Sequence, residues 1–157
     1  MTATGRLEPP REAADGSLYE RDPYTWAMQQ AVLLRERRFD ELDIDNVAEE
    51  METLGRSEAK ELRSSYPLFL MHLLKWRHQP KRRPRSWAGT IVRERQSAQL
   101  GLQENPGLKS LQAELFAEAY RPARKEAEAE TGLPLTAFPE TSPYPLEQAL
   151  DEAFWPE

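Results

Sequence analysis

The side chains best suited to bind an anion lie in a short basic segment that follows the most apolar stretch of the chain. From Lys75 to Arg95 there are eight basic residues and one acid, so the segment carries +7, whereas the whole 157-residue chain carries −6. Arginine can hold a phosphate through two hydrogen bonds, and a tryptophan can stack on a base. Trp76 and Trp87 are interleaved with the cations. The candidate anion- or partner-binding residues are Lys75, Arg77, Lys81, Arg82, Arg83 and Arg85.

This segment has two interpretations. It binds nucleic acid, or it docks on an acidic surface of this chain or of a second copy. We favour docking, because a run of charges is usually a solvated or self-paired face, and because the overall acidity weakens nonspecific attraction to nucleic acid. Trp76 and Trp87 also fall on apolar stripes, where we expect them to be buried rather than free to stack on bases.

A second polar group combines acids with cations on a predicted helix. Asp45, Glu49, Glu52 and Arg56 follow one another at gaps of four, three and four, so they share one helical face. We favour a solvated face, and the alternative is that the acids receive a cation, a partner's arginines or the basic loop 81–85. Together with one histidine they form the candidate polar site, which consists of Glu49, Glu52, Arg56 and His72.

The two histidines do not form a metal site. His72 and His78 are six residues apart and point to different sides of a helix. No His-Glu-x-x-His motif occurs, nor the paired Glu-x-x-His motifs of a di-iron bundle. We expect His72 to be a core histidine that hydrogen-bonds a carboxylate of the preceding acidic helix. We therefore expect no catalytic, cofactor-binding or metal-binding residue.

Several classes of protein are excluded by what the sequence lacks. Without cysteine there is no disulfide, thiolate nucleophile or cysteine-ligated zinc. No Gly-x-Ser-x-Gly motif, phosphate-binding glycine loop or dinucleotide fingerprint is found. The first residues lack the apolar core of a signal peptide, and the apolar run 68–74 is far shorter than the roughly 20 residues of a membrane span. We expect a soluble cytoplasmic protein without cofactor or membrane contact.

Helical periodicity supplies the elements that position these residues. A first helix is predicted from Asp22-Pro23, an N-cap followed by proline at the first helical position. Its face, expected to be well buried, consists of Tyr24, Ala27, Met28, Ala31 and Leu34. A bent long helix, or two nearly collinear ones, then runs from about Asp43 to before Pro80, because Pro67 should kink or split it near residues 63–66. Its apolar positions are Val47, Met51, Leu54, Leu62, Tyr66, Phe69, Leu73 and Trp76.

Two further helices and a tail complete the predicted chain. Ser86 should cap a helix that ends at Asn105-Pro106-Gly107, and the next helix should bend at Pro122 and end at Gly132. The pattern predicts an all-α helical bundle with a long kinked central helix. Its core would be built by the first helix, the central helix and the helix after residue 107. We assign residues 1–17 to a disordered arm, 18–132 to the bundle and 133–157 to a proline-rich strap packed on it, which ends in a short helix from Leu146 to Phe154.

Several motifs, read together, resemble a known family. They are Leu18-Tyr19-Glu20-Arg21-Asp22 with Trp26; Glu41-Leu42-Asp43, Asn46-Val47-Ala48-Glu49-Glu50 and Leu54-Gly55-Arg56-Ser57-Glu58; Leu70 to Trp76 with Pro80 and Ser86-Trp87; and Glu130-Thr131-Gly132-Leu133-Pro134 with Phe138-Pro139. They are similar to the bacterial family catalogued as domain of unknown function twenty-nine, common in cyanobacteria and proteobacteria. The resemblance covers residues 18–157 and implies a helical fold with no established activity. It transfers no functional residue, and the sequence departs from the family pattern at Pro67, Pro122 and Pro145.

Three functional hypotheses follow. The leading one is a non-catalytic intracellular protein-interaction module, with a second copy of the chain as one candidate partner through the acidic and basic faces. The alternative is nucleic-acid binding through Lys75 to Arg95. The third is an enzyme that uses His72 with Glu49 and Glu52.

Overall fold

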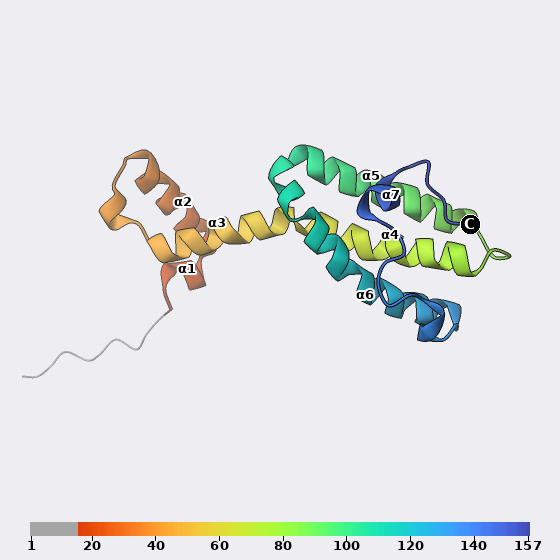
Figure 1. Cartoon of the computed structure of the whole chain (residues 1–157). Coiled ribbons are helices and arrows are strands. Elements are labelled where there is room, and N and C mark those ends of the chain that lie inside the picture. Colours follow the sequence, from red (N-terminus) through yellow and green to blue (C-terminus); the bar gives the residue numbers. More distant parts are fainter. Residues whose placement is uncertain (1–15) are drawn as a thin grey trace, which may run out of the picture. The chain divides into compact units, whose positions relative to one another are not determined.

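The computed structural model describes residues 16–157, and all of its regular structure in that range is helical (Figure 1). The predicted disordered arm falls almost wholly outside the described residues. The chain divides into two compact units, one up to Glu52 and one from Thr53 onward. The protein is thus all-α, with a long central helical stretch from Ile44 to His78 that is interrupted at Ala59.

The N-terminal unit is built from short helices and held by polar contacts. It contains α1 (Leu18–Arg21), α2 (Pro23–Arg35), the short 3-10 helix η1 (Phe39–Glu41) and the first half of α3 (Ile44–Glu58). Asp22 caps α2 by accepting a hydrogen bond from the Thr25 amide, so the predicted start of this helix is confirmed. A four-residue helix, α1, precedes it and was not predicted. Its Ser17 and Glu20 form a reciprocal capping box.

The C-terminal unit has α4 (Lys60–His78) at its centre. Figure 1 shows α4 between α5 (Arg85–Glu104) and α6 (Gln112–Thr131), and it packs on both. Short 3-10 helices, η2 (Pro106–Ser110) and η3 (Leu135–Ala137), join the segments, and α7 (Leu146–Leu150) lies near the end of the chain. The central helical stretch is interrupted at Ala59 and not at residues 63–66, because Pro67 is accommodated inside a continuous α4.

The apolar core belongs to the C-terminal unit. Leu62, Tyr66, Phe69 and Leu73 follow gaps of four, three and four along α4, and all are fully buried. The rings of Tyr66 and Phe116 of α6 meet edge to face with centroids 5.6 Å apart. Each such large side chain contributes about 1.5–3 kcal/mol through its burial. Residues after α6 cover this core: Phe138, Tyr144 and Ala149 are buried, and Leu146, Phe154 and Trp155 pack against it.

The expectation that the first helix builds the core is wrong. No residue of α2 belongs to the core cluster, and only Trp26 and Gln30 of this helix are buried. Periodicity identified an apolar stripe correctly but could not show what lies against it. Two local predictions also differ. Pro84 precedes the first turn of α5 in place of a Ser86 cap, and the last helix is shorter than expected, ending at Leu150. Gly132 does end α6, with a left-handed φ of 71°.

Candidate functional site

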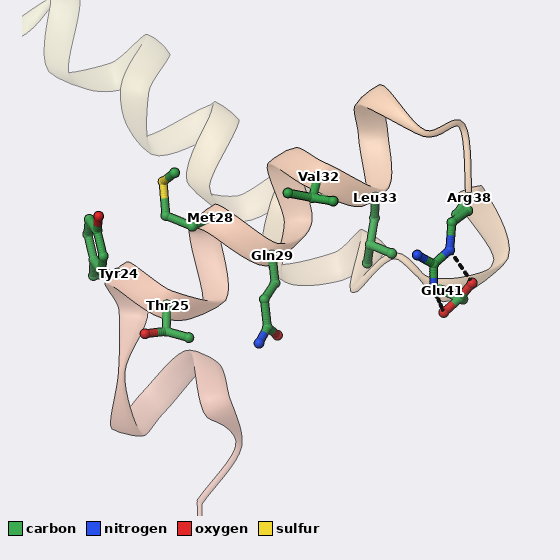
Figure 2. Close-up of a pocket in the computed structure, with 8 residues that line it drawn as sticks. All are labelled: Tyr24, Thr25, Met28, Gln29, Val32, Leu33, Arg38 and Glu41. Carbon is green, nitrogen blue, oxygen red and sulfur yellow. Dashed lines mark hydrogen bonds and ion pairs between the residues drawn. The ribbon is translucent and has the colours of Figure 1, made fainter.

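The feature of the N-terminal unit that is best shaped for binding is an apolar groove along α2. The groove has a volume of about 650 Å³. Figure 2 shows its lining, which is formed by Tyr24, Thr25, Met28, Gln29, Val32, Leu33, Arg38 and Glu41. Tyr24, Met28 and Val32 recur every four residues and are 75%, 50% and 45% exposed. An apolar stripe of this kind on a helix is normally covered.

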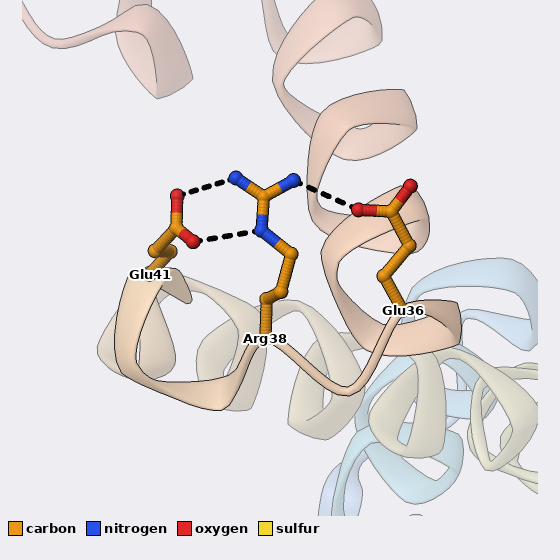
Figure 3. A network of polar contacts seen from close by, with 3 residues as sticks. All are labelled: Glu36, Arg38 and Glu41. Carbon is orange, nitrogen blue, oxygen red and sulfur yellow. Dashed lines mark hydrogen bonds and ion pairs between the residues drawn. The ribbon is translucent and has the colours of Figure 1, made fainter.

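One end of the groove is fixed by ion pairs. Figure 3 shows the Arg38 guanidinium held by two carboxylates. Its Nε and Nη2 atoms donate to both oxygens of Glu41 at 2.7 and 2.6 Å, and Nη1 donates to Glu36 at 2.8 Å. These hydrogen bonds raise the pKa of Arg38. Arg37 precedes it with a φ of 58°, a left-handed conformation that turns the chain directly after α2. The network therefore fixes the loop at the groove's end without needing a buried core.

Polar side chains hold α2, which carries the groove, against the start of α3. The Trp26 indole N–H donates to Asp43 Oδ2 at 3.0 Å, and Gln30 Oε1 accepts from the Asp43 amide at 2.9 Å. Hydrogen bonds from Asn46 and then from Trp26 lower the pKa of Asp43. The Tyr19 hydroxyl donates to Glu50 at 2.7 Å, and this bond raises the pKa of Tyr19 to about 12. Asp43 thus joins the first turn of α3 to α2.

The candidate polar residues are divided between the two units. Glu49 and Glu52 belong to the N-terminal unit, and both are exposed. Arg56 belongs to the C-terminal unit and donates to the hydroxyl of Thr53 at 2.8 Å. His72, also in the C-terminal unit, is buried, and its Nδ1 hydrogen-bonds the Leu68 carbonyl at 2.9 Å in place of the carboxylate that we expected. Burial, assisted by the charge of Lys75, lowers the pKa of His72.

Two of the candidate cations are engaged inside the C-terminal unit. Lys75 is buried, its ammonium pairs with the Glu130 carboxylate, and it lies 4.4 Å from the centroid of the Trp87 ring. Arg83 donates to the Trp76 carbonyl at 2.9 Å and lies over its ring at 5.0 Å. Neither tryptophan is therefore free to stack on a base.

The remaining candidate cations are exposed. Arg77 borders a cavity of about 250 Å³ that also includes Tyr144. Burial raises the pKa of Tyr144 to about 12. The side chains of Lys81, Arg82 and Arg85 make no hydrogen bond or ion pair within residues 16–157. The structure thus leaves three adjacent positive charges open to a ligand or partner.

The structure also contains a buried charge that the sequence did not single out. Arg95 of α5 is 0% exposed, and its Nε and Nη2 atoms donate to the carbonyls of Ala149 and Phe154 at 2.7 and 2.9 Å. Its Nη1 atom has no hydrogen-bond partner, and burial lowers its pKa. The signal in the sequence is its position, because residue 95 falls four after Ile91 and three before Ala98 on the inward stripe of α5.

A family model described as "Domain of unknown function DUF29" matches residues 18–155. The chain belongs to the DUF29 family. No curated protein and no solved structure matches it. The expected resemblance is therefore confirmed, and membership of DUF29 assigns no activity to the groove or to the cations.

Between residues 16 and 157 no three His, Asp or Glu side chains come together in a way that could hold a metal ion. None of the helices in that range combines the length and apolar character that a membrane crossing requires.

Proposed function

We propose that this DUF29 protein is a non-catalytic intracellular protein-interaction module, and that the groove along α2 is its binding surface. The observation that carries the proposal is the open stripe of Tyr24, Met28 and Val32 beside a groove of about 650 Å³. Side chains four residues apart form a ridge that interdigitates with another helix. Methionine in such a ridge adapts to the shape of its partner.

The thin core of the N-terminal unit supports the same proposal. Among the described residues of this unit, Trp26 is the one buried apolar side chain. Units of about 40 residues seldom bury enough apolar surface to be stable alone. A protein partner that covers the α2 stripe would supply the burial that the unit lacks.

The test is affinity purification of the tagged protein from its own host after nuclease treatment, followed by mass spectrometry. Met28→Ser removes apolar surface from the groove without changing the charge. Leu111→Ser is the matched control, since Leu111 is an exposed apolar residue of the C-terminal unit, whereas α2 belongs to the N-terminal unit. We expect a specific protein that is retained by wild type and by the control and lost by Met28→Ser. Equal recovery with all three proteins contradicts the proposal.

Nucleic-acid binding is the second candidate, favoured by the open charges of Lys81, Arg82 and Arg85. It predicts nucleic acid that co-purifies when nuclease is omitted and is lost when these three residues are changed to Ala. With three phosphate contacts, affinity should fall by about 20- to 40-fold between about 50 and 200 mM salt. Because both tryptophans are engaged, binding should not depend on base identity.

A further inference from the structure

We infer that the occupant of the α2 groove is α5 of a second copy of this chain. This inference rests on the proposed function and names its partner. It requires that α5 present an exposed apolar face at helical spacing, and that the two surfaces carry opposite charge.

The exposed face of α5 has the right pattern. Val92 and Leu100 are 38% and 53% exposed, although they lie on a helix whose other face is buried. Arg85, Gly89 and Gln96 share their side, so exposed positions recur at gaps of four, three, four and four from residue 85 to residue 100. This stripe is about 22 Å long, and the α2 stripe from Tyr24 to Val32 is about 12 Å long. The α5 face can therefore span the groove.

The two faces can approach closely. Ridges of residues four apart on both helices interdigitate in the commonest class of helix packing. Apart from the adjoining residues and the backbone of α5 itself, nothing lies within 4 Å of the place where a Cβ of residue 89 would stand, so a side chain of a second helix can enter beside Gly89. Val92 and Leu100 would meet Met28 and Val32, whose side chains are likewise uncovered.

The charges of the two surfaces are complementary. Residues 16–52 carry ten acidic and four basic side chains, a net charge of −6. In the segment from Lys75 to Arg95, which includes the first half of α5, Lys75 and Arg95 are buried, and the cations that remain exposed outnumber the single acid, Glu94. They are Arg77, Lys81, Arg82, Arg85 and Arg93. The side chains of Lys81, Arg82 and Arg85 have no hydrogen-bond or ion-pair partner within the described range; Arg85 is the first residue of α5, and the other two lie in the loop before it. Opposite fields of this kind orient two surfaces and exclude like-charged alternatives.

A contact between unlike surfaces occurs twice when two copies close on each other. Each copy would offer its groove to the α5 of the other, and the pair would be related by a two-fold axis. A substitution in the groove would then weaken two contacts in every dimer. This doubling is the quantitative signature of the arrangement.

The experiment is sedimentation equilibrium or light scattering of the full chain over a range of concentrations. We expect a species of twice 18.1 kDa that dissociates on dilution and dissociates more readily as salt is raised. Met28→Ser and Leu100→Ser should each raise the dissociation constant about a hundredfold, from about tenfold for each of two contacts. Leu111→Ser should leave it unchanged.

The decisive experiment mixes two variants, each of which has lost one of the two contact surfaces. Met28→Asp spoils the groove and Leu100→Asp spoils α5, so each protein alone should be monomeric. Their mixture retains one intact contact, between the groove of the second and the α5 of the first, and should form a mixed dimer. A mixture that stays monomeric overturns the inference.

The other outcomes separate this inference from the function on which it rests. If wild type is monomeric but Met28→Ser loses a different host protein, the second copy is not the occupant and the interaction module stands. If Leu100→Ser dimerises normally while Met28→Ser does not, the groove meets a surface other than α5. If Met28→Ser changes neither self-association nor recovery of any partner, both proposals fail.

Discussion

Arg95 allows a stability prediction that can be worked out from its contacts. Its guanidinium is wholly buried and donates to the carbonyls of Ala149 and Phe154, which lie at the end of the chain. Arg95→Ala removes two hydrogen bonds from a charged donor, each contributing about 1.5–3 kcal/mol. The removal also eliminates the desolvation cost of a buried cation, a cost that no ion pair offsets among the described residues.

The lost hydrogen bonds lower the free energy of unfolding and the relieved desolvation raises it, while the cavity left by the side chain lowers it further. We expect the free energy of unfolding of the C-terminal unit to fall by about 3 kcal/mol. For a unit of this size that corresponds to a decrease in melting temperature of roughly 12–20 °C. Circular dichroism during heating measures the change, and limited proteolysis should show earlier cleavage after Gly132.

Arg93 provides the matched control in the same helix. It is exposed and pairs with Glu94, so Arg93→Ala should cost less than about 1 kcal/mol. Equal melting temperatures for the two alanine variants would refute the reasoning. A gain in stability for Arg95→Met would show that desolvation outweighs the two hydrogen bonds.

Four further substitutions test other features of the fold. Burial holds the pKa of His72 below its usual value of 6.5, so the unfolded chain takes up a proton that the folded ring does not. Urea titrations should therefore show the free energy of unfolding falling as the pH is lowered from about 7 to 5, and His72→Gln should flatten that slope. Glu130→Gln leaves the buried Lys75 ammonium without its anion and should lower the unfolding free energy by about 1–2 kcal/mol, whereas no loss in thermal melts would mean that the pair is solvated. Gly132→Ala forces a Cβ into a left-handed conformation and should lower the free energy of unfolding by about 1 kcal/mol. Gly55→Ala lies inside α3 and should instead raise it by about 0.5–1 kcal/mol. Changes of the same sign in the two variants would contradict this backbone argument.

Sequence patterns predicted the helices better than their partners. The gaps of three and four along α4 identify Leu62, Tyr66, Phe69 and Leu73, because a core helix must repeat apolar residues at that spacing. The same rule applied to α2 gave a stripe with no core against it. Spacing reports which residues share a face and contains no information on what that face meets.

For the candidate site, too, the sequence predicted which residues matter but not what each of them contacts. The basic segment was found from composition, yet its members have different roles: Lys75 is paired in the interior, Arg83 is stacked on Trp76, and Arg85 is open. Sequence could not distinguish them because all three are equally charged. The groove was missed because it depends on a left-handed turn at Arg37 and on the Arg38 network, which follow from folding and not from a motif.

The polar construction of the N-terminal unit has a consequence for its thermodynamics. Heat capacity and denaturant sensitivity both scale with the apolar area exposed on unfolding. A unit held by Trp26, Gln30 and Asp43 hydrogen bonds around one buried ring exposes little such area. Its melting should therefore be broad, nearly linear in temperature and only weakly responsive to urea, while the C-terminal unit unfolds in a sharp transition. Binding of a partner to α2 would appear in calorimetry as a second sharp transition that the free chain lacks.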